Sequence, residues 1–380
     1  MSEPAIRMGT EFNAESEFGI NDLLEQVLDQ GASDLHLTAG APPVIRLNGV
    51  LHPLDGFPRL MPDHLRRMVY GILQQKQREA LEAELELDIS YALPGKARFR
   101  VNVYFQRGAI GAAFRMIPFE IKPIDALGLP PQVADLARIP RGLVLVTGPT
   151  GSGKSTTLAS LVDIVNTERA CHIMTVEDPI EFLHRHKTAV VNQRELGQDT
   201  HSFANALKHV LRQDPDVILV GEMRDLETIS TALTAAETGH LVFATLHTQD
   251  APQTIDRIID VFPSYQQQQV RVQLASTLQG VVTQQLVPTP DGNGRVVATE
   301  IMIATPAVRN LIREAKIHQV YTAMQAGARF GMETMDQALA RLVHARKITK
   351  EAGLERCHDA EDFQRMLVAP PTPGPARAYA

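Results

Sequence analysis

The chain has 380 residues, more than one typical core accommodates, so we expect two domains with flanking segments. Hydrophobic residues make up 44% and charged residues 21%, as in ordinary globular proteins, and the formal charge of -7 argues against a strongly basic nucleic-acid-binding protein. Cys171 and Cys357 form no CxxC pair, which excludes a four-thiolate zinc site and favours a reducing cytoplasm.

The two ends of the chain carry no pattern of a fold. Residues 1–18 are polar and acidic, without the plan of a signal peptide, and residues 369–380 are rich in proline. We expect both segments to be disordered. The longest apolar runs have the length of a strand, so no membrane insertion is expected.

Residues 19–118 alternate between helical and strand-like patterns. Apolar residues at helical spacing predict helices over 20–28 and 64–85. Short β-rich or alternating runs predict strands over 34–38, 44–48, 87–91, 97–105 and 111–116. This order predicts a small α+β domain.

Frequent prolines over 119–140 predict an interdomain linker, beyond which the pattern changes. Uninterrupted apolar strands are expected over 143–147, 172–176, 217–221 and 241–245, with helices over 155–166, 202–211 and 225–238. Such alternation predicts an α/β domain over 141–368, with a mainly parallel sheet covered by helices on both faces. From Gln253 to about Leu367 we expect mainly helix, with one hairpin-like break at 291–294.

A phosphate-binding loop follows the first strand of this domain. Its residues are Gly148, Pro149, Thr150, Gly151, Ser152, Gly153, Lys154, Ser155 and Thr156. The glycines let backbone N–H groups surround phosphate oxygens, and the following helix adds a favourable dipole. We expect Lys154 to reach the β- and γ-phosphates and Ser155 to bind Mg²⁺, which predicts a P-loop nucleoside triphosphatase.

Acidic residues follow two neighbouring strands. Glu222 ends the strand 217–221, and Gly221 stands where a Walker B motif usually has its aspartate, so we assign Glu222 to water-mediated Mg²⁺ coordination. A carboxylate cluster follows the strand 172–176, and hydrolysis needs one carboxylate to orient and deprotonate water. Spacing alone does not choose between Glu177 and Glu181.

Two histidines flank the strand 241–245. His247 lies at the edge that carries the P-loop, where it suits γ-phosphate sensing, whereas His240 lies at the opposite end. Three arginines of the first domain form a further candidate set: Arg98, Arg100 and Arg115. From spacing alone these arginines are best interpreted as part of a solvated sheet face.

Together these motifs resemble the secretion ATPases that power type II secretion and type IV pili. The Walker A loop, an aspartate box over 175–182, an atypical Walker B motif over 214–224 and a histidine box over 238–247 occur in the family's order, and the resemblance covers about residues 19–367. The run 307–314 resembles the signature of the family's retraction motors, with Val308 where isoleucine is usual. The sequence lacks the longer N-terminal region and four-cysteine zinc insert that extension and secretion relatives generally carry.

The resemblance implies a PAS-like N-terminal domain, a RecA-like ATPase domain and a homohexameric ring. It favours Glu181 as the general base, and it carries His240 and His247 over as histidine-box residues. It also implies that Arg98, Arg100 and Arg115 face the phosphates of ATP. The residues assigned to pilus coupling rather than hydrolysis are Arg309, Asn310, Leu311, Ile312, Arg313 and Glu314.

The function implied by the resemblance is Mg²⁺-dependent ATP hydrolysis that drives pilus retraction from the cytoplasmic face of the inner membrane. The implied partners are an inner-membrane platform protein and a paralogous retraction ATPase. Alternatives are an accessory retraction ATPase, an extension or type II secretion ATPase, a nucleic-acid motor and a non-hydrolysing nucleotide binder. The net negative charge of the chain argues against the nucleic-acid motor. The presence of Lys154, Ser155, Glu181 and Glu222 argues against the non-hydrolysing protein.

Overall fold

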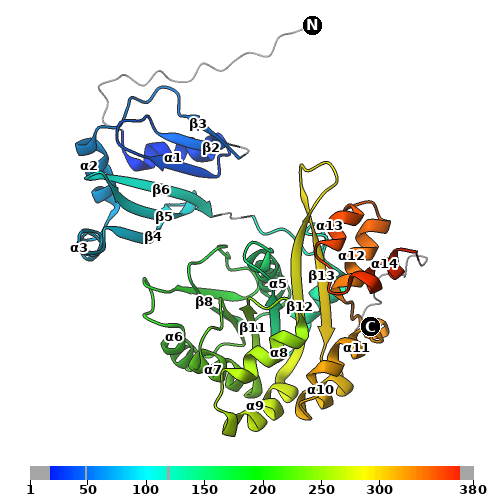
Figure 1. Ribbon diagram of the computed structural model, residues 1–380. Helices are drawn as coiled ribbons and strands as arrows, with labels where there is room; N and C mark the ends of the chain where they lie inside the picture. The colour runs from blue at the N-terminus through cyan, green and yellow to red at the C-terminus, as the bar shows by residue number, and fades with distance from the viewer. Residues whose placement is uncertain (1–17, 48, 118–119, 369–380) are drawn as a thin grey trace. The chain divides into compact units, whose positions relative to one another are not determined.

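The structure, a computed structural model, describes residues 18–47, 49–117 and 120–368 and divides between residues 119 and 120 into two compact units (Figure 1). The ends expected to be disordered lie outside the described residues except for Phe18. This side chain is buried, and its ring meets that of Phe57 edge-on with centroids 4.9 Å apart. Phe18 therefore belongs to the first core. Among the described residues, no helix is long and apolar enough to cross a bilayer.

The first unit is an antiparallel sheet with helices on one face. Its described strands have the order β3-β2-β1-β6-β5-β4, with the bounds β1 Asp34–Leu37, β2 Val44–Leu47, β3 Val50–Pro53, β4 Glu86–Leu93, β5 Ala97–Gln106 and β6 Ala109–Ile117. The described helices are α1 (Ile20–Asp29), α2 (Pro62–Ile72) and α3 (Gln75–Glu84). Leu24, Val69 and Phe114 join these helices to one sheet face in a single core, which confirms the α+β prediction. The helix expected over 64–85 is two helices, because Leu73 is extended (φ −93°, ψ 135°) and ends α2.

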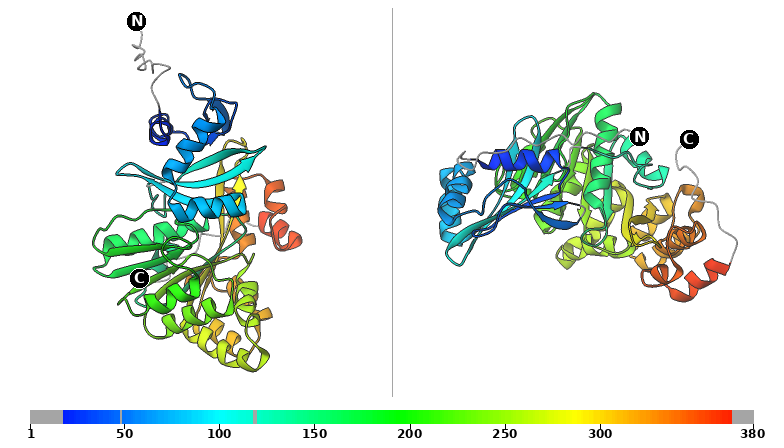
Figure 2. Two further views of the ribbon diagram at one scale, coloured as in Figure 1. Left: turned by 90° about the vertical axis from the view of Figure 1, so that its left-hand side faces the viewer. Right: turned by 90° about the horizontal axis from the view of Figure 1, so that it is seen from above.

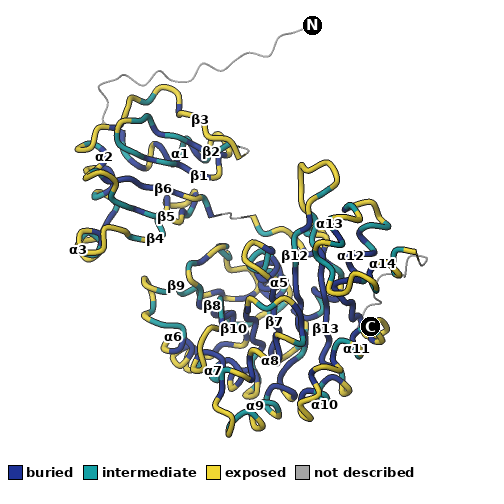
Figure 3. Tube along the Cα trace, viewed as in Figure 1, coloured by how far each residue is buried: buried dark blue, intermediate teal, exposed yellow. Residues whose placement is uncertain are grey.

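The second unit is built on a mixed sheet in which parallel pairing predominates. The described strands have the order β13-β12-β7-β11-β10-β8-β9, and every neighbouring pair except β12 and β13 is parallel. Their bounds are β7 Gly142–Thr147, β8 His172–Glu177, β9 Val190–Glu195, β10 Val217–Val220, β11 Leu241–Leu246, β12 Leu278–Pro288 and β13 Arg295–Ile303. Strands β7, β10 and β11 are buried along their whole length (Figure 3), as expected for strands covered on both faces.

The helices of this unit surround the sheet and continue beyond it. Their bounds are α4 Pro131–Arg138, α5 Lys154–Glu168, α6 Phe203–Val210, α7 Leu226–Glu237, α8 Ala251–Asp260, α9 Ser264–Thr277, α10 Pro306–Arg313, α11 Val320–Gln325, α12 Met335–His344, α13 Lys350–Leu354 and α14 Ala360–Val368. Helices α10 to α14 gather beside the β12–β13 edge in Figures 1 and 2. The prediction of mainly helix after Gln253 is wrong at β12 and β13, which form a long hairpin within the sheet.

The segment expected to be a linker over 119–140 belongs, from residue 120 onward, to the second unit. Pro131 occupies the first turn of α4, where a missing N–H costs no helical hydrogen bond. Val133 and Leu136 of this helix are fully buried in the core of the second unit. The prolines therefore start a packed helix here rather than marking a free connection.

Candidate nucleotide-binding and catalytic site

The phosphate loop follows β7 and leads directly into α5. Gly148 has a φ of 132°, and a Cβ atom there would lie 2.3 Å from the carbonyl oxygen of Gln284, so only glycine fits. Lys154 Nζ donates to the carbonyl oxygens of Gly148 at 2.8 Å and Pro149 at 3.1 Å. Burial lowers the pKa of Lys154, and the nearby Glu222 and Glu181 oppose this effect. The loop therefore forms an anion cradle that already contains its cation.

A cavity of 620 Å³ lies between this loop and the carboxyl ends of β8, β10 and β11. The sequence-predicted residues that line it are Thr150, Gly151, Gly153, Lys154, Ser155, Thr156, Glu181, Glu222 and His247. Ser152 lines instead an adjoining cavity of 750 Å³, which shares Gly153 and Thr156 with the first. Parallel strands present their carboxyl ends at one edge of a sheet, which is why residues from separate motifs meet here.

Glu222, two residues after the end of β10, is held by two basic side chains. Its Oε1 atom accepts a hydrogen bond from Arg224 Nε at 2.6 Å and lies 3.1 Å from His247 Nε2. Burial opposes ionisation of this carboxyl, but Arg224 and His247 outweigh it, so the pKa of Glu222 lies below its ordinary value. Glu222 is therefore an anion at neutral pH. Arg224 lines the cavity and was absent from the sequence-predicted set.

Glu177 and Glu181, which spacing could not separate, have different environments. Glu177 Oε1 accepts from Thr175 Oγ1 at 2.6 Å and from Gln193 Nε2 at 3.1 Å. Burial raises the pKa of Glu177 to about 7, although both hydrogen bonds act in the opposite direction. Glu181 is exposed and lines the cavity. Glu177 is thus a fixed part of the wall, whereas Glu181 has the access to water that a general base needs.

Gly221 lets the ends of two strands approach closely. A Cβ atom at this position would lie 3.1 Å from Glu177 Cα and 3.2 Å from the carbonyl oxygen of Val176. The Gly221 N–H donates to that same Val176 oxygen at 2.8 Å. An aspartate at the usual Walker B position would therefore require the ends of β10 and β8 to shift by a few tenths of an ångström. Thr245 of β11, another wall residue that sequence analysis missed, donates its hydroxyl to the Gly221 carbonyl.

His240 and the three arginines lie outside this group. His240 precedes β11, at the end of the strand opposite to the P-loop, where its Nδ1 atom lies 2.9 Å from the carbonyl oxygen of Ala235. The arginines belong to the first unit, where Arg100 pairs across β5 and β6 with Arg115. Arg98, Arg100 and Arg115 share the sheet face opposite to the core. Their role toward phosphates stays a prediction.

The segment that resembles the retraction signature forms α10. Arg309 donates to the carbonyl oxygens of Ala275 at 2.6 Å and Ser276 at 2.9 Å, at the C-terminal end of α9. These bonds stabilise carbonyls that a helix end leaves without partners, so Arg309 fastens α10 to α9. Within the predicted coupling set, Asn310, Arg313 and Glu314 are exposed, Leu311 is half-buried and Ile312 is buried. The exposed residues remain the candidates for coupling.

This fold and cavity define a P-loop nucleotide-binding protein of the α/β class. A family model described as Type II/IV secretion system protein matches residues 13–365, and the chain belongs to that family.

Within this family, the chain is similar to several known ATPases of type IV pili and secretion systems. The chain is 51% identical over 344 residues to the type IV pilus retraction ATPase PilT of Pseudomonas aeruginosa, covering 90% of this chain and 99% of the relative. It is 41% identical to the type IV pilus ATPase PilU of the same organism, over 91% of this chain and 90% of the relative. A crystal structure of the pilus retraction motor PilT with bound ADP superposes with a TM-score of 0.86 at 50% identity, covering 92% of this chain and 99% of the other. The ATPase DotB of Legionella pneumophila gives 0.79 at 29% identity, over 90% and 97%.

Proposed function

We propose that this chain is an ATP-hydrolysing motor that drives type IV pilus retraction. The observation that carries the proposal is one cavity lined by Lys154, Ser155, Glu181 and Glu222, in a chain 51% identical to a retraction ATPase. The relative of known structure was solved with bound ADP, which supports a nucleotide as the ligand of this cavity.

The residues of the cavity suit ATP and Mg²⁺. The phosphates would lie in the loop 148–156, where Lys154 exchanges its carbonyl partners for β- and γ-phosphate oxygens. The nucleoside would extend into the adjoining cavity of 750 Å³. Mg²⁺ prefers oxygen ligands and keeps several waters, so the Ser155 hydroxyl and, through water, the Glu222 carboxylate fit it. The ion would neutralise charge on the phosphates.

Hydrolysis needs a proton acceptor for the attacking water. The Glu181 carboxylate takes this proton as the water oxygen bonds to the γ-phosphorus and the bond to ADP breaks. The Lys154 ammonium stabilises the charge that develops on the phosphoryl oxygens. The proton then leaves with the released phosphate. His247, in contact with Glu222, suits sensing of the γ-phosphate.

Retraction would couple this cycle to an assembly. In this proposal the chain forms a homohexamer at the cytoplasmic face of the inner membrane and acts on a membrane platform protein. Arg98, Arg100 and Arg115 would supply positive charge to the nucleotide within the ring, as arginine fingers do. His240 would contribute as a histidine-box residue rather than by lining the cavity. The exposed Asn310, Arg313 and Glu314 would transmit the motion to the pilus.

Two measurements test the proposal. Purified protein should release phosphate from ATP in the presence of Mg²⁺. A strain lacking the gene should be hyperpiliated and unable to twitch, whereas bald cells would indicate an extension motor. The 41% identity to PilU supports an accessory retraction ATPase as the second candidate, which predicts twitching that depends on a paralogue.

A further inference from the structure

The segment between β8 and β9, residues 178–189, carries Glu181 and forms no helix or strand. Such a segment holds a catalytic group accurately only when its backbone is bound by a rigid scaffold. In this chain two separate elements bind it, one on each side: the edge strand β9 and the second half of α5.

Strand β9 holds the first part of the segment through side chains. Gln193 donates from Nε2 to the carbonyl oxygen of Phe182 at 2.9 Å, and its Oε1 atom accepts from the His184 N–H at 2.8 Å. The same Nε2 atom bonds Glu177 at 3.1 Å, so one amide joins the cavity wall to the segment. Two residues along the strand, the buried Glu195 accepts from the Ile180 N–H at 3.1 Å. Glu181 therefore lies between two backbone positions that β9 fixes.

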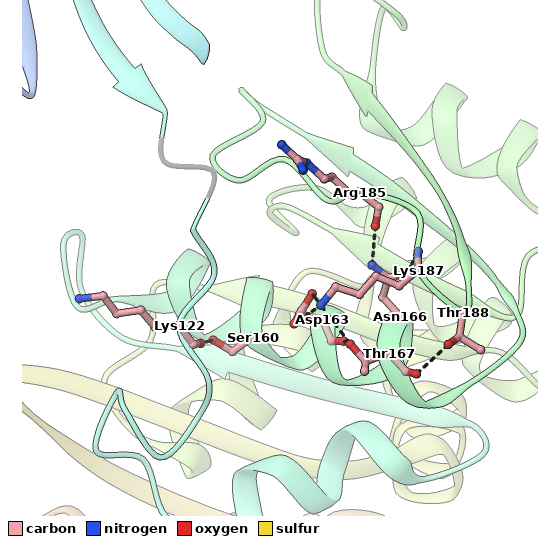
Figure 4. A network of polar contacts seen from close by, with 8 residues as sticks. All are labelled: Lys122, Ser160, Asp163, Asn166, Thr167, Arg185, Lys187 and Thr188. Carbon is pink, nitrogen blue, oxygen red and sulfur yellow. Dashed lines mark hydrogen bonds and ion pairs between the residues drawn. The ribbon is translucent and has the colours of Figure 1, made fainter. Parts of the chain in front are cut away.

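Helix α5 holds the second part (Figure 4). Asn166, which is fully buried, donates from Nδ2 to the Arg185 carbonyl at 2.8 Å and accepts from the Lys187 N–H at 3.2 Å. The Lys187 ammonium bonds Asp163 on the preceding turn at 2.7 Å. Thr188 donates to the Thr167 carbonyl at 2.8 Å. The segment is thus attached to the helix whose first residue is the phosphate-loop lysine.

We propose that Gln193 and Asn166 are positioning residues for hydrolysis, which act by holding the Glu181 segment at a fixed distance from the phosphate loop. The inference rests on the proposed function and deepens it. Because Gln193 and Asn166 bind backbone atoms of the segment, their loss displaces Glu181 while Lys154 and the loop glycines keep their own contacts. A misplacement of about 1 Å lowers the catalysed rate by up to about 100-fold without weakening ground-state binding.

The test compares variants of the full-length protein that each lose one amide. Gln193→Ala and Asn166→Ala remove the two positioning side chains. Asn192→Ala is the matched control, because Asn192 lies on the opposite face of β9, is exposed, and contacts His172 rather than the segment. For each protein, kcat and KM for ATP and the Kd for ADP are measured. Hydrogen exchange follows the amides of Ile180, His184 and Lys187.

We expect Gln193→Ala to lower kcat by about 10- to 100-fold, with the Kd for ADP within twofold of wild type and with faster exchange at His184. Asn192→Ala should match wild type. Unchanged kcat in Gln193→Ala, or an equal loss of kcat and ADP affinity, would overturn the inference. If a variant does not fold, hydrogen exchange of the wild-type protein provides the test. Amides of Ile180, His184 and Lys187 that all exchange without protection would also overturn the inference. Wild-type protein that binds ADP without hydrolysing ATP would contradict the proposed function as well.

Discussion

The three carboxylates around the phosphate loop differ in what surrounds them. Glu222 is paired with Arg224 and stays ionised, whereas Glu177 is half-buried with neutral hydrogen-bond donors, and the loss of hydration raises its pKa to about 7. Glu181 is exposed to the cavity. One site can therefore hold carboxyls of different acidity, because each environment favours a different protonation state.

Replacing the proposed base should separate chemistry from binding. Glu181→Gln keeps the size of the side chain but cannot accept a proton, so we expect kcat for ATP to fall by at least about 100-fold while ADP affinity is retained. Glu227→Gln makes the same change at an exposed ion pair with Lys208 and should leave kcat unaltered. Phosphate release and ADP titration measure both effects. Normal turnover in Glu181→Gln would reject this residue as the base.

The free energy of unfolding should depend on pH through the carboxyl of Glu177. Because folding raises the pKa of this group from 4.5 to about 7, its contribution to stability is full below 4.5 and is lost as pH rises through 7. Glu177→Gln stays neutral, so its stability should improve relative to wild type across this window, by at most about 1.4 kcal/mol per pH unit. Urea unfolding at pH 5, 6, 7 and 8 measures the difference. A constant difference would contradict the burial of this carboxyl.

Sequence patterns identified the residues that line the cavity better than the residues that hold them in place. Lys154 and Glu222 follow strands in recognisable motifs, and the structure brings both to one cavity. Gln193 and Arg224 act through contacts with residues from other elements or through local geometry, which no spacing encodes. Phe18 was assigned to a disordered end because its burial depends on Phe57, distant in sequence.

At the scale of elements, two strands of the second unit determine how closely the cavity walls approach. The end of β10 meets the end of β8 at Gly221, and β9 completes the edge beside β8. On the other side of the sheet, β12 lies against β7, and the contact of Gln284 with Gly148 fixes the start of the phosphate loop. Helix α10 is attached to α9 through Arg309.

A side chain at Gly221 should destabilise the second unit. In Gly221→Ala the new methyl group would lie 3.1 Å from Glu177 Cα, so the backbone at the ends of β8 and β10 must shift by a few tenths of an ångström, and we expect a cost of about 1–3 kcal/mol in the free energy of unfolding. Gly221→Asp should lose at least as much and should not gain activity. Gly294→Ala is the control, since its methyl group would meet nothing closer than 3.5 Å. Urea midpoints that agree among all three proteins would contradict this packing argument.

Neighbouring arginines of α10 should have different effects. Arg309→Ala leaves the last carbonyls of α9 without donors and should cost about 1–3 kcal/mol of stability. Arg313→Ala is exposed and should change stability by less than about 0.5 kcal/mol, with ATP turnover retained and pilus retraction lost. Thermal unfolding, phosphate release and twitching assays measure the three properties. Equal losses of stability in Arg309→Ala and Arg313→Ala would contradict the assignment of Arg309 to packing and Arg313 to coupling.

Periodicity predicted both the uniformly buried strands and the alternating ones, such as β5, but missed strands rich in polar residues. Strands β7, β10 and β11 have continuous apolar sequences because both faces are covered. Strand β9 has only two apolar residues, and its polar side chains include Gln193 and Glu195, which bind the backbone of the segment before it. Strand β12 contains buried polar side chains that bond to other elements: Thr283 with Thr147, and Gln284 Nε2 with Thr157. These polar residues interrupt the apolar pattern, so the strand was not recognised from its sequence.

On the scale of the whole molecule, the chain combines an ATPase unit with a smaller unit that carries three arginines on an open sheet face. The cavity of the second unit is lined by Lys154, Glu181 and Glu222, the residues to which we assign phosphate binding, the base and Mg²⁺ coordination. Under the proposed function, the arginines of the first unit would add positive charge near the phosphates in a ring of chains. Retraction is then the mechanical output of the site.

Retraction of single pili in living cells tests this account most directly. A deletion strain is complemented with the wild-type gene or with Glu181→Gln, and labelled pili are followed by microscopy. We predict that deletion leaves many pili that extend without retracting, that the wild-type gene restores retraction, and that Glu181→Gln does not. Cells that lack pili after deletion, or that retract them normally with Glu181→Gln, would contradict the account.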